Sequence, residues 1–330
     1  MTDVAVVGGG VVGLAIAWRC AQRGMSVTVH DDQRPGAFTV AAGMLAPVSE
    51  AYFGEGDLVG LLVASAQQWP GFAAELAAYG DVGYRTEGTL VVALTNDDLA
   101  EADRLWSYQE ALGQEVTRLR AAQLREREPG LHPRVRGGAL TSDQQADPRR
   151  LLAVLRTAAR AAGAQIVPGP VRSLSDVDAE TVVVAAGCGS AELAGLPVRP
   201  VKVVPRADGE VVVGATAEER TDATPTAGAV LELLRAATDL LPELTEYELA
   251  EVGVGHRPGT PDNAPILGPL PHQADRPGRL VVATGHYRHG ILLTPVTADA
   301  ITELIVSGEP PELIAPFSPA RFLAHEQVRS

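Results

Sequence analysis

The chain has 330 residues, of which 46% are apolar, and its formal net charge is −14 with a pI near 4.9. This length and composition allow a full hydrophobic core, in two domains or in one large interleaved one. The acidic charge argues against nucleic acid and anionic membranes as partners, because both bind to cationic surfaces.

Cysteine usage and the N-terminal residues bear on the compartment. The chain has two cysteines, Cys20 and Cys188, and their positions do not indicate a disulfide framework, which fits a reducing environment. The stretch "MTDVAVVGGG" has no basic region or cleavage site, and no apolar run reaches the length of a membrane span. We therefore expect a cytoplasmic globular protein.

The first predicted elements form a β-α-β unit. The pattern of apolar residues predicts a strand at 3–8, a helix at 11–23 and a second strand at 26–31, with Gly24 just after the end of the helix. The unit has about the length that a crossover between parallel strands needs.

Glycines at the first turn of this unit fit the pattern G-x-G-x-x-G. Gly8 permits a tight turn, Gly10 lets the backbone approach a pyrophosphate, and Gly13 lets the helix pack on the strand. Asp31, 18 residues after Gly13, is the candidate for binding a ribose, and Asp32 is its neighbouring alternative. A glycine-rich turn without a ligand is the competing interpretation. The context predicts a dinucleotide site, but it does not choose FAD over NAD.

Alternating helices and strands follow in the middle of the chain. Helices are predicted at 57–79 with a break at Pro70, at 97–112, at 148–162 with Asp147 as N-cap, and at 226–241. Strands are predicted at 89–94, 136–143, 181–187, 210–216 and 247–257, and the last elements are a strand at 279–285 and a helix at 290–306. Because no linker separates these segments, we expect two interleaved domains.

Several stretches resemble the glycine oxidases of thiamine biosynthesis, within the D-amino acid oxidase family of FAD enzymes. They are "VVGGGVVGLAIAW", "AAGMLAP", "VVVAAG", "VVPRADGEVVVGAT", "GHRPGTPDNAPILG" and "GHYRHGILLTP", and they occur in the expected order over nearly the whole chain. The last two in succession are the specific ones.

The resemblance implies an α/β fold. A Rossmann-like FAD-binding domain of the glutathione-reductase type would be interleaved with a smaller α+β substrate domain on a mostly antiparallel sheet. The FAD-binding domain would comprise residues 1–78, 139–198 and 257–330, and the substrate-binding domain residues 79–138 and 199–256.

The resemblance also implies which residues bind the flavin, without a covalent bond because the terminal motif has no cysteine. Val11, Val12, Asp31 and Asp32 would hold the adenosine end, and Val171 would touch the adenine side through its backbone. Along the flavin would lie Ala42, Gly43, Met44, His286, Tyr287, Arg288, His289, Gly290, Ile291 and Leu292. A helix N-terminus in this last stretch would suit the electron-rich end of a reduced isoalloxazine.

Two arginines are the candidates for binding the substrate. By resemblance, Arg257 clamps a substrate carboxylate and Arg288 also faces the substrate, and a guanidinium fork matches a carboxylate with two hydrogen bonds. The alternative is that both are ordinary surface arginines. His286 and His289 have a spacing that a metal could use, but no third ligand with suitable spacing exists, so we expect no metal.

The sequence departs from the resembled family after Lys202. There the family has a longer segment with a tyrosine that contacts the substrate, whereas Lys202 is followed here directly by Val203. Either the wall of the active site is shorter in this protein, or the printed sequence lacks part of it.

The predicted activity is oxidative deamination of glycine or another small amino acid to the imino acid, with O2 reduced to H2O2. The imino acid would supply thiazole synthesis in thiamine biosynthesis. No catalytic side chain is predicted, since flavin N5 takes the hydride, and we expect a homo-oligomer. The alternatives are a D-amino acid dehydrogenase with another electron acceptor, a non-catalytic FAD-binding protein, and an NAD-dependent dehydrogenase.

Overall fold

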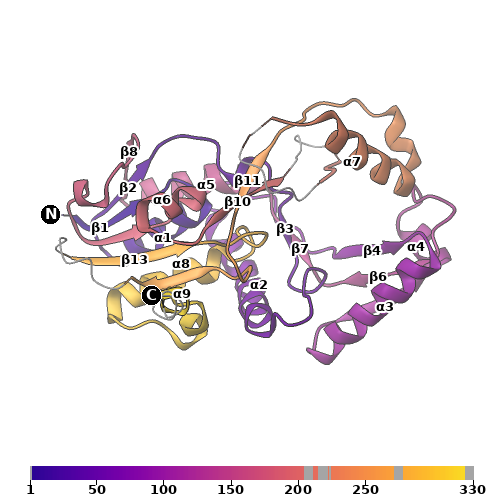
Figure 1. Cartoon of the computed structure of the whole chain (residues 1–330), viewed down its shortest axis with the longest axis horizontal. Coiled ribbons are helices and arrows are strands. Elements are labelled where there is room, and N and C mark those ends of the chain that lie inside the picture. Colours follow the sequence, from indigo (N-terminus) through magenta and orange to yellow (C-terminus); the bar gives the residue numbers. More distant parts are fainter. Residues whose placement is uncertain (1, 204–210, 215–221, 223, 271–277, 324–330) are drawn as a thin grey trace, which may run out of the picture.

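The computed structural model describes residues 2–203, 211–214, 222, 224–270 and 278–323 (Figure 1). Two regions lie side by side, one around a large sheet that includes β1 and β13, the other around a small sheet that includes β4 and β6. Within these described ranges, no helix is both long and apolar enough to cross a membrane.

The large sheet has six strands. In spatial order they are β12 (Ile266–Pro269), β13 (Arg279–Thr284), β9 (Ala179–Val184), β1 (Thr2–Val7), β2 (Val27–Asp31) and β8 (Gln165–Pro168). All neighbouring strands are parallel except β12 and β13. The chain order reverses beside β1, since β2 follows on one side and the much later β9 lies on the other. In open α/β sheets such a switch point is where ligands bind.

Both faces of the large sheet are buried. Along β1, Val4 and Val6 pack in one core while Ala5 and Val7 pack in another, as the alternation of side chains in a strand requires. The first core also holds the helices α1 (Val11–Gln22), α2 (Gly56–Leu76), α5 (Pro148–Ala161) and α8 (Thr294–Ser307). The second is covered by α6 (Ser190–Ala194) and residues around Leu196.

The second region contains a three-stranded antiparallel sheet. Its order is β4 (Thr89–Ala93), β6 (Gly137–Thr141) and β5 (Val116–Arg120), with α3 (Asn96–Ala111), α4 (Ala121–Arg127) and α7 (Ala227–Leu240) nearby. Two short antiparallel pairs lie between the regions, β10 (Arg199–Val203) with β11 (Gly255–Gly259) and β3 (Met44–Leu45) with β7 (Gln144–Gln145). The predicted fold class is confirmed.

The remaining elements are short. They are the 3-10 turns η1 (Ala37–Thr39), η2 (Leu174–Asp176), η3 (Gly187–Gly189), η4 (Pro242–Glu246) and η5 (Glu312–Phe317), and the helix α9 (Ala320–Leu323). The predicted boundary between residues 138 and 139 falls inside β6, which pairs with the strands of the second region, and the division into two domains otherwise stays a prediction.

Local chemistry explains the helix starts that the sequence predicts well. The Asp147 carboxylate accepts hydrogen bonds from the backbone N–H groups of Arg149 and Arg150 at 2.8 and 3.0 Å, and Pro148 fills the first position of α5. The Thr226 side chain caps α7 in the same way, accepting from Ala229 N at 3.3 Å.

Two predicted helices are wrong in detail. Helix α2 continues through Pro70, because Trp69 and Phe72 on either side are buried and their packing outweighs the lost backbone hydrogen bond. Helix α8 begins at Thr294 instead of residue 290. This start places Pro295 in the first turn, where its missing N–H costs nothing, whereas an earlier start would place it in the helix interior.

Two predicted strands are also wrong. Residues 247–254 are not in a strand, and Tyr247 and Leu249 are 61% and 60% exposed, so the alternation there does not mark a buried face. Residues 211–214 are likewise outside any strand, and the rest of the predicted strand at 210–216 lies outside the described residues.

Candidate functional site

A cavity of about 1930 Å³ runs along the carboxyl-terminal ends of the strands of the large sheet. It is lined by the residues that directly follow β1, β2, β9 and β13 and by the loop 37–44. Pockets for ligands of drug size measure about 300–1,000 Å³, so this cavity has room for something larger.

The glycine loop forms one part of the cavity wall. Gly8 has φ +126°, and a Cβ there would overlap the carbonyl oxygen of Ala185 on the neighbouring strand's end. A Cβ on Gly13 would overlap the carbonyl oxygen of Gly8, so helix and strand touch at this point. A Cβ on Gly10 would meet no protein atom within 4 Å, because Gly10 faces the open cavity. The three glycines therefore have the three different environments that a pyrophosphate loop requires.

The N-terminus of α1 also suits an anion. Gly10 is its N-cap and offers no side chain to the first N–H groups, and the first turn has no acidic residue. Val11 and Val12 line the cavity at this helix end. Free N–H groups and the helix dipole at this position favour a phosphate group.

Both candidate ribose ligands line the cavity. Asp31, at the end of β2, is 5% exposed, and its carboxylate accepts hydrogen bonds from Gln33 N at 2.9 Å and from Arg156 on α5 at 2.8 Å. Asp32 is paired with Arg34 instead. Both carboxylates are held by hydrogen bonds, and Asp31, the more buried of the two and the last residue of β2, stays the proposed ribose ligand. Its partner Arg156 was not predicted.

The middle of the cavity is lined by Ala42, Gly43 and Met44, with Val171 towards the β2 side. Gly43 has φ +82°, and a Cβ there would overlap the carbonyl oxygen of Ala146. The loop consequently lies flat against the residues that precede α5. Met44 is 40% exposed into this space.

The segment from His286 to Leu292 forms turns before α8 and not the first turns of a helix. His286, Tyr287, Arg288, Gly290 and Ile291 line the cavity. Tyr287 has φ +46°, a conformation rare for a side chain of its size, and its N–H donates to the carbonyl of Pro258 on β11 at 3.0 Å. This bond ties the turn to the strand that carries Arg257.

His289 and Leu292 do not line the cavity. Leu292 is buried, and its carbonyl accepts hydrogen bonds from Ser65 at 2.6 Å and from the Trp69 indole at 2.9 Å. Burial lowers the pKa of both His286 and His289 to about 4, with further lowering for His289 by Arg288 and Arg257. Both imidazoles are therefore neutral at pH 7. In the described part of the chain, no three His, Cys, Asp or Glu side chains gather as a metal site.

Arg257 and Arg288 lie in the same part of the cavity. Burial lowers the pKa of Arg257, and the positive charge of Arg288 lowers it further, while Tyr287 and Glu50 act in the opposite direction, so the two guanidinium groups lie close enough to repel each other. An anionic ligand between them would relieve this repulsion.

Glu50 is a residue of this site that the sequence did not predict. It lines the cavity, its Oε2 lies 3.4 Å from Nδ1 of His289, and both arginines act on its charge. Glu50 is the last residue of the stretch "AAGMLAPVSE", and nothing in its spacing from the other site residues marks it as part of the site.

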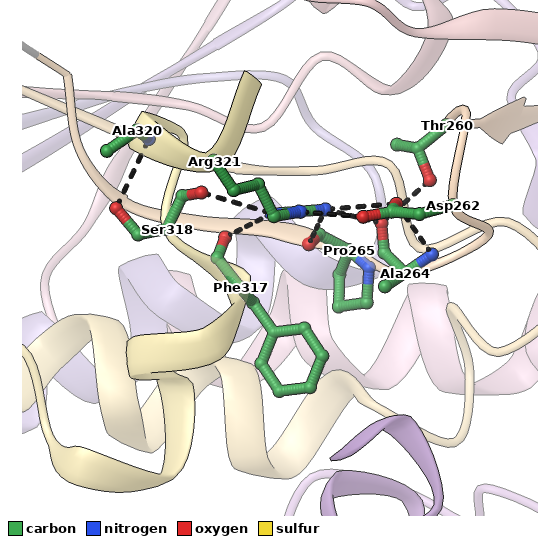
Figure 2. A network of polar contacts seen from close by, with 8 residues as sticks. All are labelled: Thr260, Asp262, Ala264, Pro265, Phe317, Ser318, Ala320 and Arg321. Atoms are coloured by element: carbon green, nitrogen blue, oxygen red, sulfur yellow. Dashed lines mark hydrogen bonds and ion pairs between the residues drawn. The ribbon is translucent and has the colours of Figure 1, made fainter. Parts of the chain in front are cut away.

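A polar network holds the loop after Arg257 in place (Figure 2). The guanidinium of Arg321, from α9, forms a two-pronged ion pair with Asp262, at 2.8 and 3.2 Å, and donates to the carbonyls of Ala264 and Pro265 at 3.1 and 2.9 Å. Thr260, in the same loop, fills the space beside Gly285 just before His286. The network thus holds the loop that contains Thr260 against the backbone of the turn at Gly285 and His286.

The chain matches the sequence model of the FAD dependent oxidoreductase family, abbreviated DAO, at residues 3–204 and 201–304. The match covers most of the chain and is broken near Lys202, where the sequence predicts a shortened segment. The alignment with a relative from Synechocystis spans 374 positions, more than the 330 residues of this chain, so that relative has residues without a counterpart here.

Similar proteins include a glycine oxidase from Geobacillus kaustophilus, 32% identical over 97% of each chain. The Synechocystis relative, a bifunctional ThiO/ThiG protein, is 33% identical over 98% of this chain, which spans only 54% of that protein. The crystal structure of the Geobacillus kaustophilus glycine oxidase superposes with a TM-score of 0.86 at 31% identity, covering 96% of this chain and 98% of that one.

FAD is the cofactor of this family, and the glycine environments, the open helix N-terminus and the size of the cavity all fit it. Gly8, Gly10, Val11, Val12 and Asp31 would hold its nucleotide end. Its flavin end would be held by Ala42, Gly43, Met44, His286, Tyr287, Arg288, Gly290 and Ile291. The match over most of the chain, together with a cavity of this form, shows that the protein belongs to the family of FAD-dependent oxidoreductases.

Proposed function

We propose that this protein oxidises glycine or another small amino acid to the corresponding imino acid, with O2 reduced to H2O2. The observation that carries the proposal is the pair Arg257 and Arg288 in the wall of the flavin cavity. A guanidinium group binds a carboxylate with two parallel hydrogen bonds, so an amino acid carboxylate is a natural ligand for this pair.

Binding of a carboxylate would change the electrostatics of the pair. In the free protein, burial and the neighbouring Arg288 both act against the positive charge of Arg257. An anion between the arginines offsets both effects. A carboxylate therefore binds more favourably at this site than it would to an exposed arginine. The proposal therefore gives both residues the role of holding the substrate by its acid group.

The reaction needs little acid-base chemistry from the protein. Bound FAD supplies a two-electron oxidation. Ile291 and the neutral His286, both buried, would form an uncharged part of the wall near the arginines that hold the substrate. An amine presented in its neutral form is the species such a site would oxidise.

The relatives support the substrate class and a place in metabolism. One of them is named glycine oxidase, and another is named ThiO/ThiG, of which this chain spans about half. A relative from Rhizobium etli, 34% identical over 93% of this chain, is named a putative thiamine biosynthesis oxidoreductase. We accordingly propose that the imino acid product serves thiazole formation in thiamine biosynthesis.

Anaerobic mixing of the purified holoenzyme with single amino acids tests the proposal. Glycine, sarcosine, both alanines and ethylamine are each added while the flavin absorbance is recorded. Glycine or another small amino acid should bleach the flavin, and ethylamine, which has no carboxylate, should not. If no amino acid bleaches it, the proposed substrate class is wrong.

Admission of O2 to the bleached protein tests the acceptor. The expected result is rapid return of the yellow colour with one H2O2 formed for each flavin. Bleaching by an amino acid followed by slow reoxidation without H2O2 would indicate a dehydrogenase with another acceptor.

A further inference from the structure

Glu50 is held in a defined position beside the arginine pair. Its side chain is 30% exposed, and the residues before it, from Leu45 to Val48, are buried. The buried Asp143 carboxylate accepts hydrogen bonds from Val48 N at 3.0 Å and Ser49 N at 3.1 Å. These hydrogen bonds to Asp143 therefore fix the backbone that leads to Glu50.

Three charged groups that line the cavity act on one another here. Arg288 and Arg257 both stabilise the carboxylate of Glu50, and Glu50 in turn stabilises the cation of Arg257. Burial has the larger effect and, with a smaller contribution from Asp143, raises the pKa of Glu50 above its ordinary value despite the two arginines.

The other neighbours of Glu50 do not offset its charge. His289, 3.4 Å away, stays neutral above pH 4 and cannot form an ion pair with Glu50 at pH 7. Asp143 has its own partners, since it also accepts a hydrogen bond from Thr141 at 2.7 Å. Among the described side chains, the two arginines are therefore the cations that balance Glu50.

We propose that Glu50 determines substrate specificity by limiting the arginine pair to a ligand with a single carboxylate. With Glu50 offsetting one of the two guanidinium charges, a ligand with one negative charge completes the balance. A second carboxylate on the ligand would lie next to Glu50, and the two negative charges would repel each other. This inference rests on the proposed function, because it concerns how the same arginines choose among amino acids.

The variant Glu50→Gln removes the charge and keeps the shape. Oxidised holoenzyme is titrated with acetate and with malonate, and binding is read from the change in the flavin absorbance spectrum, which requires no turnover. Wild type should prefer acetate. In Glu50→Gln the dissociation constant of malonate should fall relative to that of acetate by about tenfold or more. Glu50→Asp keeps the charge and should keep the wild-type preference.

Glu55→Gln is the matched control, since it makes the same change five residues further on, outside the cavity lining, and should leave the ratio unchanged. Glu50→Ala also removes the charge, and it replaces Glu50→Gln in the titration if the glutamine variant does not fold. An unchanged ratio in the charge-removing variants would overturn the inference.

Turnover separates this inference from the proposed function. If glycine bleaches the wild-type flavin but the ratio does not shift, the inference fails and the proposed function stands. If no amino acid bleaches the flavin but the ratio shifts, the inference stands and the proposed function fails. If both hold, iminodiacetate should gain on glycine as a substrate of Glu50→Gln.

Discussion

The proposed nucleotide end and the proposed substrate end of the cavity are built in different ways. At the nucleotide end, the wall includes the glycine loop at residues 8–10, where a Cβ on Gly8 would overlap the carbonyl of Ala185 and Gly10 faces the open cavity. At the substrate end, the wall is made of long charged side chains from three distant segments, at Glu50, Arg257 and Arg288. One end depends on local geometry and the other on charges brought together by the fold.

This difference determines how each end should respond to substitution. A substitution at the nucleotide end acts by steric overlap, because the new side chain occupies the place of the cofactor or of neighbouring backbone. A substitution at the substrate end changes the balance of charges. Its effect on binding is not additive with substitutions at the other two groups, because the three charges interact. The predictions below test this contrast, from the largest expected effect to the smallest.

Gly10→Val should remove the cofactor. The side chain meets no protein atom, so the fold should survive, but it fills the space in front of the α1 N-terminus. We expect FAD affinity to fall about a hundredfold or more, a loss of roughly 3 kcal/mol. Flavin content of the purified protein and its circular dichroism measure the two effects. Gly60→Val, on the exposed face of α2, is the control and should keep its flavin. Full flavin content in Gly10→Val would contradict the placement of the pyrophosphate.

Arg257→Ala should lower kcat/KM for glycine about ten- to a hundredfold while FAD stays bound, because a charged hydrogen bond is worth roughly 1.5–3 kcal/mol. Arg257→Lys should recover only part, since an ammonium group lacks the fork. Steady-state kinetics give these values.

An amine without a carboxylate provides the control for Arg257. It should be a poor substrate of wild type and lose little more in the variant. An equal loss with both substrates would make Arg257 a structural residue.

Acid should destabilise the protein through its buried histidines. His286 and His289 have pKa values near 4 in the folded protein and near 6.5 when unfolded, so the unfolded chain binds their protons first. Stability from this source is complete above pH 6.5 and is lost as the pH falls towards 4. At pH 5 the loss is on the order of 2 kcal/mol for each histidine.

The variant His289→Asn isolates this contribution. Urea unfolding at pH 7 and pH 5 should show a smaller acid-induced loss in the variant than in wild type, because contributions from other groups cancel in the comparison. The same loss in both proteins would mean that His289 is accessible to protons in the native state.

Arg321→Gln should have the smallest effect, about 1 kcal/mol of stability, because Asp262 is 42% exposed and solvent weakens the ion pair. Thermal unfolding measures it, and a double-mutant cycle with Asp262→Asn gives the energy of the pair itself. Arg23→Gln, which touches only an ion pair at 3.7 Å with both partners about half exposed, is the control and should cost less.

The sequence predicted the features that depend on neighbouring residues. The glycine loop, the Asp147 cap and the strand before His286 each follow from a few consecutive residues, and the structure contains all three. The alternation in residues 247–254 was misleading because a strand also needs a partner strand, which local sequence does not reveal.

The features that were missed arise from contacts between distant residues. Glu50 and His289 are 239 positions apart, and nothing in the spacing of either residue indicates that they meet. The early start predicted for α8 has the same cause: the stretch from Gly290 to Leu293 is apolar enough for a helix, but the Leu292 carbonyl bonds to Ser65 and Trp69 of α2, and the preceding Tyr287 is bonded to β11.

The position of β13 between β9 and β12 sets the order in which the site can form during synthesis. The glycine loop leaves the ribosome first, but its contact at Ala185 and the turn after β13 follow roughly 175 and 275 residues later, which at about 5–20 residues per second takes tens of seconds. Cofactor uptake is therefore a late event that waits for nearly the whole chain. A cell short of FAD would accumulate full-length chains with an open cavity, and not stalled fragments.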